Sequence, residues 1–297
     1  MSKKTNDEIV VVPLRHPWRW VSAGLLVLVL GAFVYSLWAS PNINHSIIDQ
    51  YLFSPKVMMA AVLTVVLTIV AMFFGTVLAI IFAVMNLSKN PVLRWVAKGY
   101  VGFFRGTPLL LQIVFWGYLG IIYPRIEVIV PFTDIVLFSE ATSNVFTAIV
   151  AGLIALSLNE GAYAAEIVRA GILSVDSGQA EAAKSLGMSS GYTLRRIVLP
   201  QAMRVIIPPM GNEFISMLKS TSLLQVVAVM ELYARTSQIS SQNLAQVELL
   251  VVAGFWYLVM TGILSIPQSY LEKKFGRGFN PAEQKSRWLK FSAKVNA

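Results

Sequence analysis

The chain has 297 residues, of which 56% are hydrophobic and only 13% are charged, about half the charged share of a typical soluble domain. Too few polar residues remain to cover a water-soluble fold of this size, so a soluble enzyme, a disordered segment and a secreted disulfide-rich module are excluded. The absence of cysteine excludes thiolate metal sites and cysteine nucleophiles, and the composition as a whole predicts an all-α integral membrane protein.

Six apolar stretches are long enough to cross a bilayer, which takes about 20 residues per helix. The first covers residues 20–39 and is most apolar over Val21–Trp38. We expect it to be a retained anchor, because no small-residue cleavage site follows it. A less regular stretch, Val205–Met230, is interrupted by polar residues. The other four are uncharged runs, between Lys56 and Lys89, Arg105 and Arg125, Glu140 and Glu160, and Glu248 and Glu272.

Six spans place both termini on the same side of the membrane, and charge predicts which side. We expect a tail at 1–19, the anchor at 20–39, a membrane domain at 57–272 with an internal loop at 170–200, and a basic tail at 273–297. Twenty of the 24 lysines and arginines then lie on the side of the termini, which the positive-inside rule assigns to the cytoplasm. The net charge of +9 therefore reports orientation and not nucleic-acid binding, and we expect the basic tail to contact anionic lipid.

The internal loop at 170–200 has its own helix signals. Asp176 can begin a short helix over Gln179–Leu186, and Gly187 can end it. Ser189 and Ser190 can cap a second short helix, Gly191–Leu199, which Pro200 closes or kinks. Two small helices joined at a glycine would form a compact projection on the cytoplasmic face.

This loop fits the pattern E-A-A-x3-G-x9-I-x-L-P at every position, through Glu181, Ala182, Ala183, Gly187, Ile197, Leu199 and Pro200. The pattern resembles the EAA signature of the permease subunits of bacterial ABC importers. In that family the loop forms a coupling helix that docks into a groove of the ATPase subunit. The resemblance implies that the two alanines allow close approach, that Glu181 makes a polar contact, and that Gly187 provides the turn. An ordinary amphipathic surface helix is the alternative.

Three further runs resemble the polar amino-acid branch of these permeases: Phe103–Leu110 (FFRGTPLL), Asn159–Arg169 (NEGAYAAEIVR) and Lys219–Leu223 (KSTSL). The match covers about Met58–Lys273. It implies the transmembrane domain of a type I ABC importer, with a five-helix core and one extra N-terminal span, in the bacterial cytoplasmic (inner) membrane. The implied partners are ATPase subunits that use ATP and Mg, a periplasmic or surface solute-binding protein, and a second permease subunit that is either another copy or a paralogue.

The sequence contains no motif for catalysis. No G-x-x-x-x-G-K-[ST] loop occurs, so the chain itself is not the ATPase. The two histidines, His16 and His45, are far apart, and neither a nucleophile elbow nor an H-E-x-x-H helix is present. We therefore expect a transport subunit without catalytic residues, a metal site or a cofactor of its own.

Polar side chains inside a membrane are costly and are therefore candidates for function. The candidates for the substrate pathway are Thr107, Gln112, Ser157, Asn159, Glu160, Asn212, Glu213, Ser216 and Lys219. Helical spacing places Asn159, Tyr163 and Glu166 on one face, with Glu160 on another face near Ser157. The same spacing places Asn212, Ser216 and Lys219 on a second polar face, with Glu213 beside them.

Each candidate also has a structural interpretation. Glu166 and Arg169 are three residues apart and can form a structural ion pair. Glu160 can contact a substrate ammonium group, or it can make a hydrogen bond between helices. Thr107 can contact the solute or satisfy backbone groups freed at Pro108. Lys219 can line the path or be anchored by an acidic neighbour. An ATP-independent transporter or channel and, less favoured, a membrane-embedded enzyme are the alternative functions.

Overall fold

The protein is described here by a computed structural model that covers residues 17–133 and 135–275. It divides into two compact units, residues 1–46 and 47–297. The first unit contains α1 (Pro17–Trp38), whose large apolar side chains are exposed on all sides, as expected of a helix in lipid. Residues 1–16 and 276–297, which hold most of both predicted tails, lie outside the described parts. A short helix, α2 (His45–Leu52), follows α1 in the chain.

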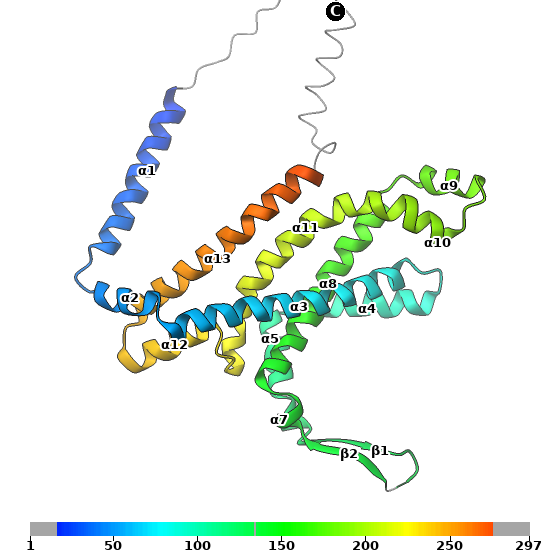
Figure 1. The fold of residues 1–297 in the computed structure, drawn as a ribbon, viewed down its shortest axis with the longest axis horizontal. Coiled ribbons are helices and arrows are strands. Elements are labelled where there is room, and N and C mark those ends of the chain that lie inside the picture. Colours follow the sequence, from blue (N-terminus) through cyan, green and yellow to red (C-terminus); the bar gives the residue numbers. More distant parts are fainter. Residues whose placement is uncertain (1–16, 134, 276–297) are drawn as a thin grey trace, which may run out of the picture. The chain divides into compact units, whose positions relative to one another are not determined.

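The second unit is a helical assembly with one small hairpin (Figure 1). Its helices before the hairpin are α3 (Pro55–Leu87), α4 (Pro91–Gly106), α5 (Leu109–Gly117) and α6 (Leu119–Ile122). The helices α7 (Thr142–Val145), α8 (Ala148–Leu173), α9 (Ser177–Ser185) and α10 (Ser190–Thr193) come next. A π-helical segment (Leu194–Val198), α11 (Leu199–Ser220), a 3₁₀ segment (Thr221–Val227), α12 (Leu232–Asn243) and α13 (Gln246–Phe275) complete it.

Four helices of the described chain are long and apolar enough to cross a membrane: α1, α3, α8 and α13. A fifth crossing results if the bent segment Ser190–Val227 and the following Leu232–Asn243 act as one span. The predicted third span, between Arg105 and Arg125, is instead built from two short helices, α5 and α6. Its uncharged composition is that of a span, but the helix is interrupted at Tyr118.

The core lies where α3 packs along α8, with α5, α11 and the 3₁₀ segment against them. Small side chains make this packing close. Leu67, Ala71, Ala155, Leu156 and Leu224 are almost completely buried there. At Gly75, a Cβ atom would lie 2.6 Å from Cγ of Glu160. The glycine therefore lets α3 lie closer to α8 than a residue with a side chain at this position would.

The predicted fifth span, Val205–Met230, does not continue as one helix. α11 ends at Ser220, and the 3₁₀ segment leads to Ala228 in a left-handed conformation, with φ of 61°. The buried carboxylate of Glu231 then begins α12 by accepting hydrogen bonds from the backbone N–H groups of Tyr233 (3.0 Å) and Ala234 (2.7 Å). It also accepts one from the Tyr257 hydroxyl of α13 at 2.8 Å. The break is thus anchored to the last helix.

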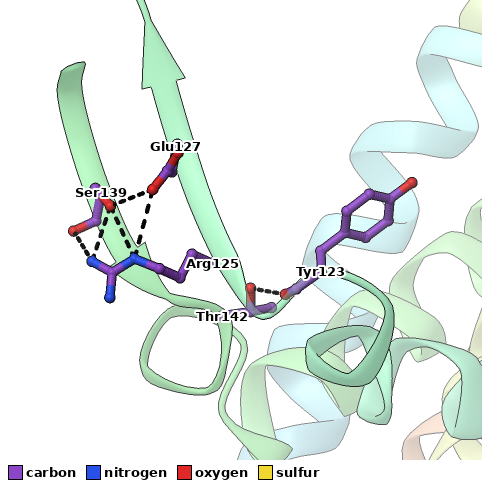
Figure 2. Close-up of polar contacts among 5 residues, drawn as sticks. All are labelled: Tyr123, Arg125, Glu127, Ser139 and Thr142. Atoms are coloured by element: carbon purple, nitrogen blue, oxygen red, sulfur yellow. Dashed lines mark hydrogen bonds and ion pairs between the residues drawn. The ribbon is translucent and has the colours of Figure 1, made fainter. Parts of the chain in front are cut away.

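A two-stranded antiparallel hairpin, β1 (Arg125–Ile129) and β2 (Val136–Ala141), departs from the all-helical prediction. Arg125 donates hydrogen bonds to the Ser139 hydroxyl, which in turn donates to Glu127 (Figure 2). At its base, the Thr142 hydroxyl donates to the carbonyl of Tyr123. The hairpin precedes α8 and the α9–α10 loop follows it, so the two projections lie at opposite ends of a helix about 39 Å long (Figure 1).

Candidate functional site

A cavity of about 610 Å³ lies where the α4–α5 junction, α8, α11 and the start of the 3₁₀ segment meet. This volume is in the range of small-molecule sites. Its lining contains both acidic and basic side chains together with hydroxyl and amide groups. The lining residues are Arg105, Gly106, Thr107, Pro108, Leu109, Asn159, Glu160, Tyr163, Glu213, Ser216, Met217, Ser220 and Leu223.

The wall formed by the α4–α5 junction owes its shape to Pro108. Because Pro108 has no backbone N–H, the carbonyl of Phe104 loses its usual helical partner. The side-chain amides of Gln112 and Asn159 both donate to that carbonyl at 3.0 Å. Gln112 also donates to the Thr107 hydroxyl at 2.9 Å, and that hydroxyl donates to the carbonyl of Phe103 at 2.9 Å. Gln112 is therefore a buried support for the wall, whereas Thr107 both stabilises the junction and lines the cavity.

On α8 the cavity is lined by Asn159, Glu160 and Tyr163. Glu160 follows Asn159 directly and so points to a different side of the helix, yet both flank the same opening. Glu160 is only 4% exposed, and its Oε1 has no hydrogen-bond partner among the described residues. The alternative of a satisfied hydrogen bond between helices is not found for this oxygen. Ser157, one turn away, is buried outside the lining.

On α11 the lining face consists of Glu213, Ser216, Met217 and Ser220. The predicted face was Asn212, Ser216 and Lys219, so the prediction had the correct spacing but was rotated about the helix axis. Asn212 points to α13 instead, where its amide donates to Glu272 at 3.3 Å. Lys219 is exposed and outside the lining, and in the described ranges it forms no ion pair with Glu213 or Glu160.

Arg105 was assigned only a topological role by sequence reasoning, yet it lines the cavity. It lies in the last turn of α4, where the helix dipole favours a cation. Its guanidinium carbon is 5.1 Å from the centroid of the Tyr163 ring, a cation–π contact. The position of Arg105 just before the Gly106-Thr107-Pro108 break is the sequence signal that could have found it.

Glu166 and Arg169 lie on α8 beyond the cavity. Arg169 Nη2 is 2.7 Å from Glu166 Oε2, and Arg169 Nε lies 3.0 Å from the same oxygen. Both side chains are partly exposed. The two side chains form an ion pair with each other, which agrees with the structural interpretation of this pair.

The loop between α8 and α11 folds as two short helices with a turn. Asp176 caps α9 by accepting from the N–H of Gly178 at 2.7 Å. At the other end, Gly187 has φ of 77°, and the N–H of Met188 donates to Ala183 while that of Gly187 donates to Lys184. This bonding is a Schellman motif, which requires a left-handed residue at the glycine.

Within the EAA triplet, Glu181 and Ala182 are exposed and Ala183 is buried, 1% exposed. Ala183 therefore packs inside the loop and cannot contact a partner directly. Leu186, at the tip, is 82% exposed and was not predicted. The second helix also differs from expectation: after α10, Ile197 lies in a π-helical turn that leads into α11. Pro200 does not close a helix but lies in the first turn of α11, where its missing N–H is tolerated.

Residues 75–277 match the protein family described as binding-protein-dependent transport system inner membrane component. The chain belongs to this family. Among its curated relatives, the arginine transport system permease protein ArgU of Corynebacterium glutamicum is 49% identical over 269 residues, covering 90% of this chain and 83% of that protein. The L-cystine transport system permease protein TcyB of Bacillus subtilis is 42% identical, covering 72% of this chain and 84% of that protein.

A solved structure, described as an amino acid ABC transporter with histidines, matches the permease with a TM-score of 0.64 and 32% identity. The match covers 76% of this chain and 97% of that one. The resemblance to ABC importer permeases and the corresponding membrane fold are therefore confirmed. The protein is the membrane-spanning permease subunit of an ABC importer, and the alternatives of an ATP-independent transporter and a membrane enzyme are set aside.

The permease has no group of three or more His, Asp or Glu side chains suited to a metal ion within its described residues. Its chemically distinctive feature is the cavity, where two carboxylates, Glu160 and Glu213, and one guanidinium, Arg105, line a single space. Such an arrangement can bind a polar, charged solute through ionic hydrogen bonds.

Proposed function

We propose that this permease imports polar amino acids and that the cavity is their binding site on the path across the membrane. The proposal is supported by the relatives, whose names refer to arginine and L-cystine, and by the similar structure described as an amino acid transporter with histidines. Every solute of this class carries an ammonium group and a carboxylate. With two acidic side chains and one basic side chain, the cavity also favours a solute that carries a net positive charge.

The observation that carries the proposal is that three charged side chains, Glu160, Glu213 and Arg105, line one cavity. Charged side chains are costly within a membrane, so a cavity that brings three of them together is best explained by a charged ligand. An ammonium group has three donors and can bind the acidic side chains of this lining. Asn159, Ser216 and Ser220 line the same space and offer further polar contacts to the solute.

Transport also needs energy, which we assign to separate ATPase subunits that use ATP and Mg. The exposed Glu181, Ala182 and Leu186 present the docking surface, and the Schellman turn at Gly187 holds it in place. A solute-binding protein would deliver the solute at the opposite face, and a second permease subunit, another copy or a paralogue, would complete the path. Both termini are then cytoplasmic, in the bacterial inner membrane.

The test of the binding site is ATP-dependent uptake by proteoliposomes that contain the permease, its ATPase and its solute-binding protein. Labelled L-arginine, L-histidine, L-glutamine and L-cystine serve as solutes. We expect Glu160→Gln to lower uptake of the transported solute at least tenfold, because the amide keeps the size but loses the charge. Glu140→Gln, an exposed hairpin residue, is the matched control and keeps normal uptake. Normal uptake by Glu160→Gln would contradict the assigned site.

The docking role is tested by substituting Glu181 and Gly187. The measurement is the amount of ATPase that copurifies with the permease. Loss of copurification together with loss of uptake is the expected result. Normal coupling after both changes would contradict this assignment without affecting the binding site.

A further inference from the structure

Arg105 is a cation with free donors in the same cavity as Glu160. In the described parts of the chain, no hydrogen bond or ion pair within 4.0 Å joins its guanidinium to another side chain. Arg105 lies near enough to Glu213 to attract it electrostatically, but the two side chains do not form an ion pair. The cavity therefore has an acidic side chain, Glu160, on its α8 wall and a guanidinium with unpartnered donors, Arg105, on its α4 wall.

The contact with Tyr163 leaves these donors available. A guanidinium that lies over an aromatic ring uses its face, whereas its N–H groups point outward in its own plane. That planar set of donors matches the two oxygens of a carboxylate and can bind both at once. A lysine ammonium at the same position would carry the charge but could not form this paired contact.

Resting on the proposed function, we propose that Arg105 binds the α-carboxylate of the solute while Glu160 binds its α-ammonium. The permease then recognises the head group shared by all α-amino acids, in one fixed orientation. Glu213, on the α11 wall, remains for a cationic or hydrogen-bonding side chain. One arginine and two carboxylates thus provide an opposite charge for each charge of a basic amino acid.

The test uses the permease–ATPase complex in nanodiscs without the solute-binding protein, so that only the permease selects the ligand. Binding of L-arginine, L-histidine, L-glutamine and L-cystine is compared with binding of their carboxamides. Each carboxamide keeps the side chain and the ammonium but lacks the carboxylate charge. At about pH 6 the α-amine of both forms is charged. We expect the wild-type complex to prefer the acid form of its ligand over the amide at least tenfold.

Arg105→Gln is expected to weaken binding of the amino acid at least tenfold, to change binding of the amide less than about twofold, and so to abolish the preference. Arg105→Lys should retain part of it. Lys98→Gln removes a positive charge from the same helix outside the cavity and should leave the preference intact. A preference for the acid that persists in Arg105→Gln would overturn the role of Arg105 alone. Absence of amino-acid binding in the wild type would contradict the proposed binding site itself, and this inference with it.

Discussion

The close approach of α3 and α8 makes Gly75→Ala an informative substitution. An added Cβ would lie 2.6 Å from Cγ and 2.8 Å from Cβ of Glu160, and 3.4 Å from the carbonyl oxygen of Ser157. Rotation of the glutamate can relieve the first contact but not the second, because its Cβ is fixed to the α8 backbone. An ordinary contact is 3.4–4 Å, so the helices must separate by roughly 1 Å. We expect this overpacking to cost about 1–3 kcal/mol of stability.

Thermal unfolding of the purified permease–ATPase complex measures this cost, with a fall of about 2–4 °C in the midpoint for each kcal/mol. Because Glu160 is displaced from the cavity, the affinity for the amino acid should fall as well. Gly254→Ala is the matched control, since a Cβ there meets nothing within 4 Å. An unchanged midpoint and unchanged affinity in Gly75→Ala would refute the argument that this glycine sets the position of Glu160.

Three further outcomes follow from local geometry. Gly187→Ala, at φ of 77°, should destabilise the loop between α8 and α11 by about 1–2 kcal/mol and reduce ATP-dependent uptake, whereas Gly191→Ala should not. Gln112→Leu removes the donors that support the α4–α5 junction and should lower the unfolding midpoint by the equivalent of about 1–3 kcal/mol; an unchanged midpoint would contradict the role of this amide. Arg125→Ala breaks an exposed hairpin ion pair of 3.7 Å and should change stability by less than about 1 kcal/mol in the same assay, so a larger loss would show that the hairpin is more tightly coupled to the fold.

The loop between α8 and α11 was predictable because its signals are local. Asp176 caps α9 and Gly187 adopts the left-handed turn that the sequence indicated, since both depend only on neighbouring backbone groups. The π-helical turn before Pro200 was not predictable from the same signals, because it depends on how α10 joins α11. The buried orientation of Ala183 likewise depends on packing between the two short helices.

The cavity was predictable in composition but not in detail. Five of the nine pathway candidates, Thr107, Asn159, Glu160, Glu213 and Ser216, line it. Helical spacing identifies residues that share a face, but it cannot say which face meets a neighbouring helix. Asn212 therefore faces α13, while its neighbour Glu213 lines the cavity.

The hairpin between Arg125 and Ala141 escaped prediction for a different reason. A run without charged residues shows that a segment is apolar, but it does not show that the segment is one continuous helix. The segment after Arg105 was therefore counted as one span, although it forms two short helices, α5 and α6. Among the described residues, the two strands that follow pair only with each other, and most of their side chains are exposed on both faces, so no buried face marks them in the sequence.

The most direct test of the account uses the absence of cysteine from the chain, which makes a single introduced thiol unique. Ser216→Cys places that thiol in the cavity, and Ser241→Cys places one on the exposed end of α12. The measurement is the rate at which a small cationic thiol reagent modifies each variant in the permease–ATPase complex, with and without the transported amino acid. The account predicts that the amino acid slows modification at position 216 and leaves position 241 unchanged. Equal rates at position 216 in a complex that still transports the solute would contradict a pathway through this cavity.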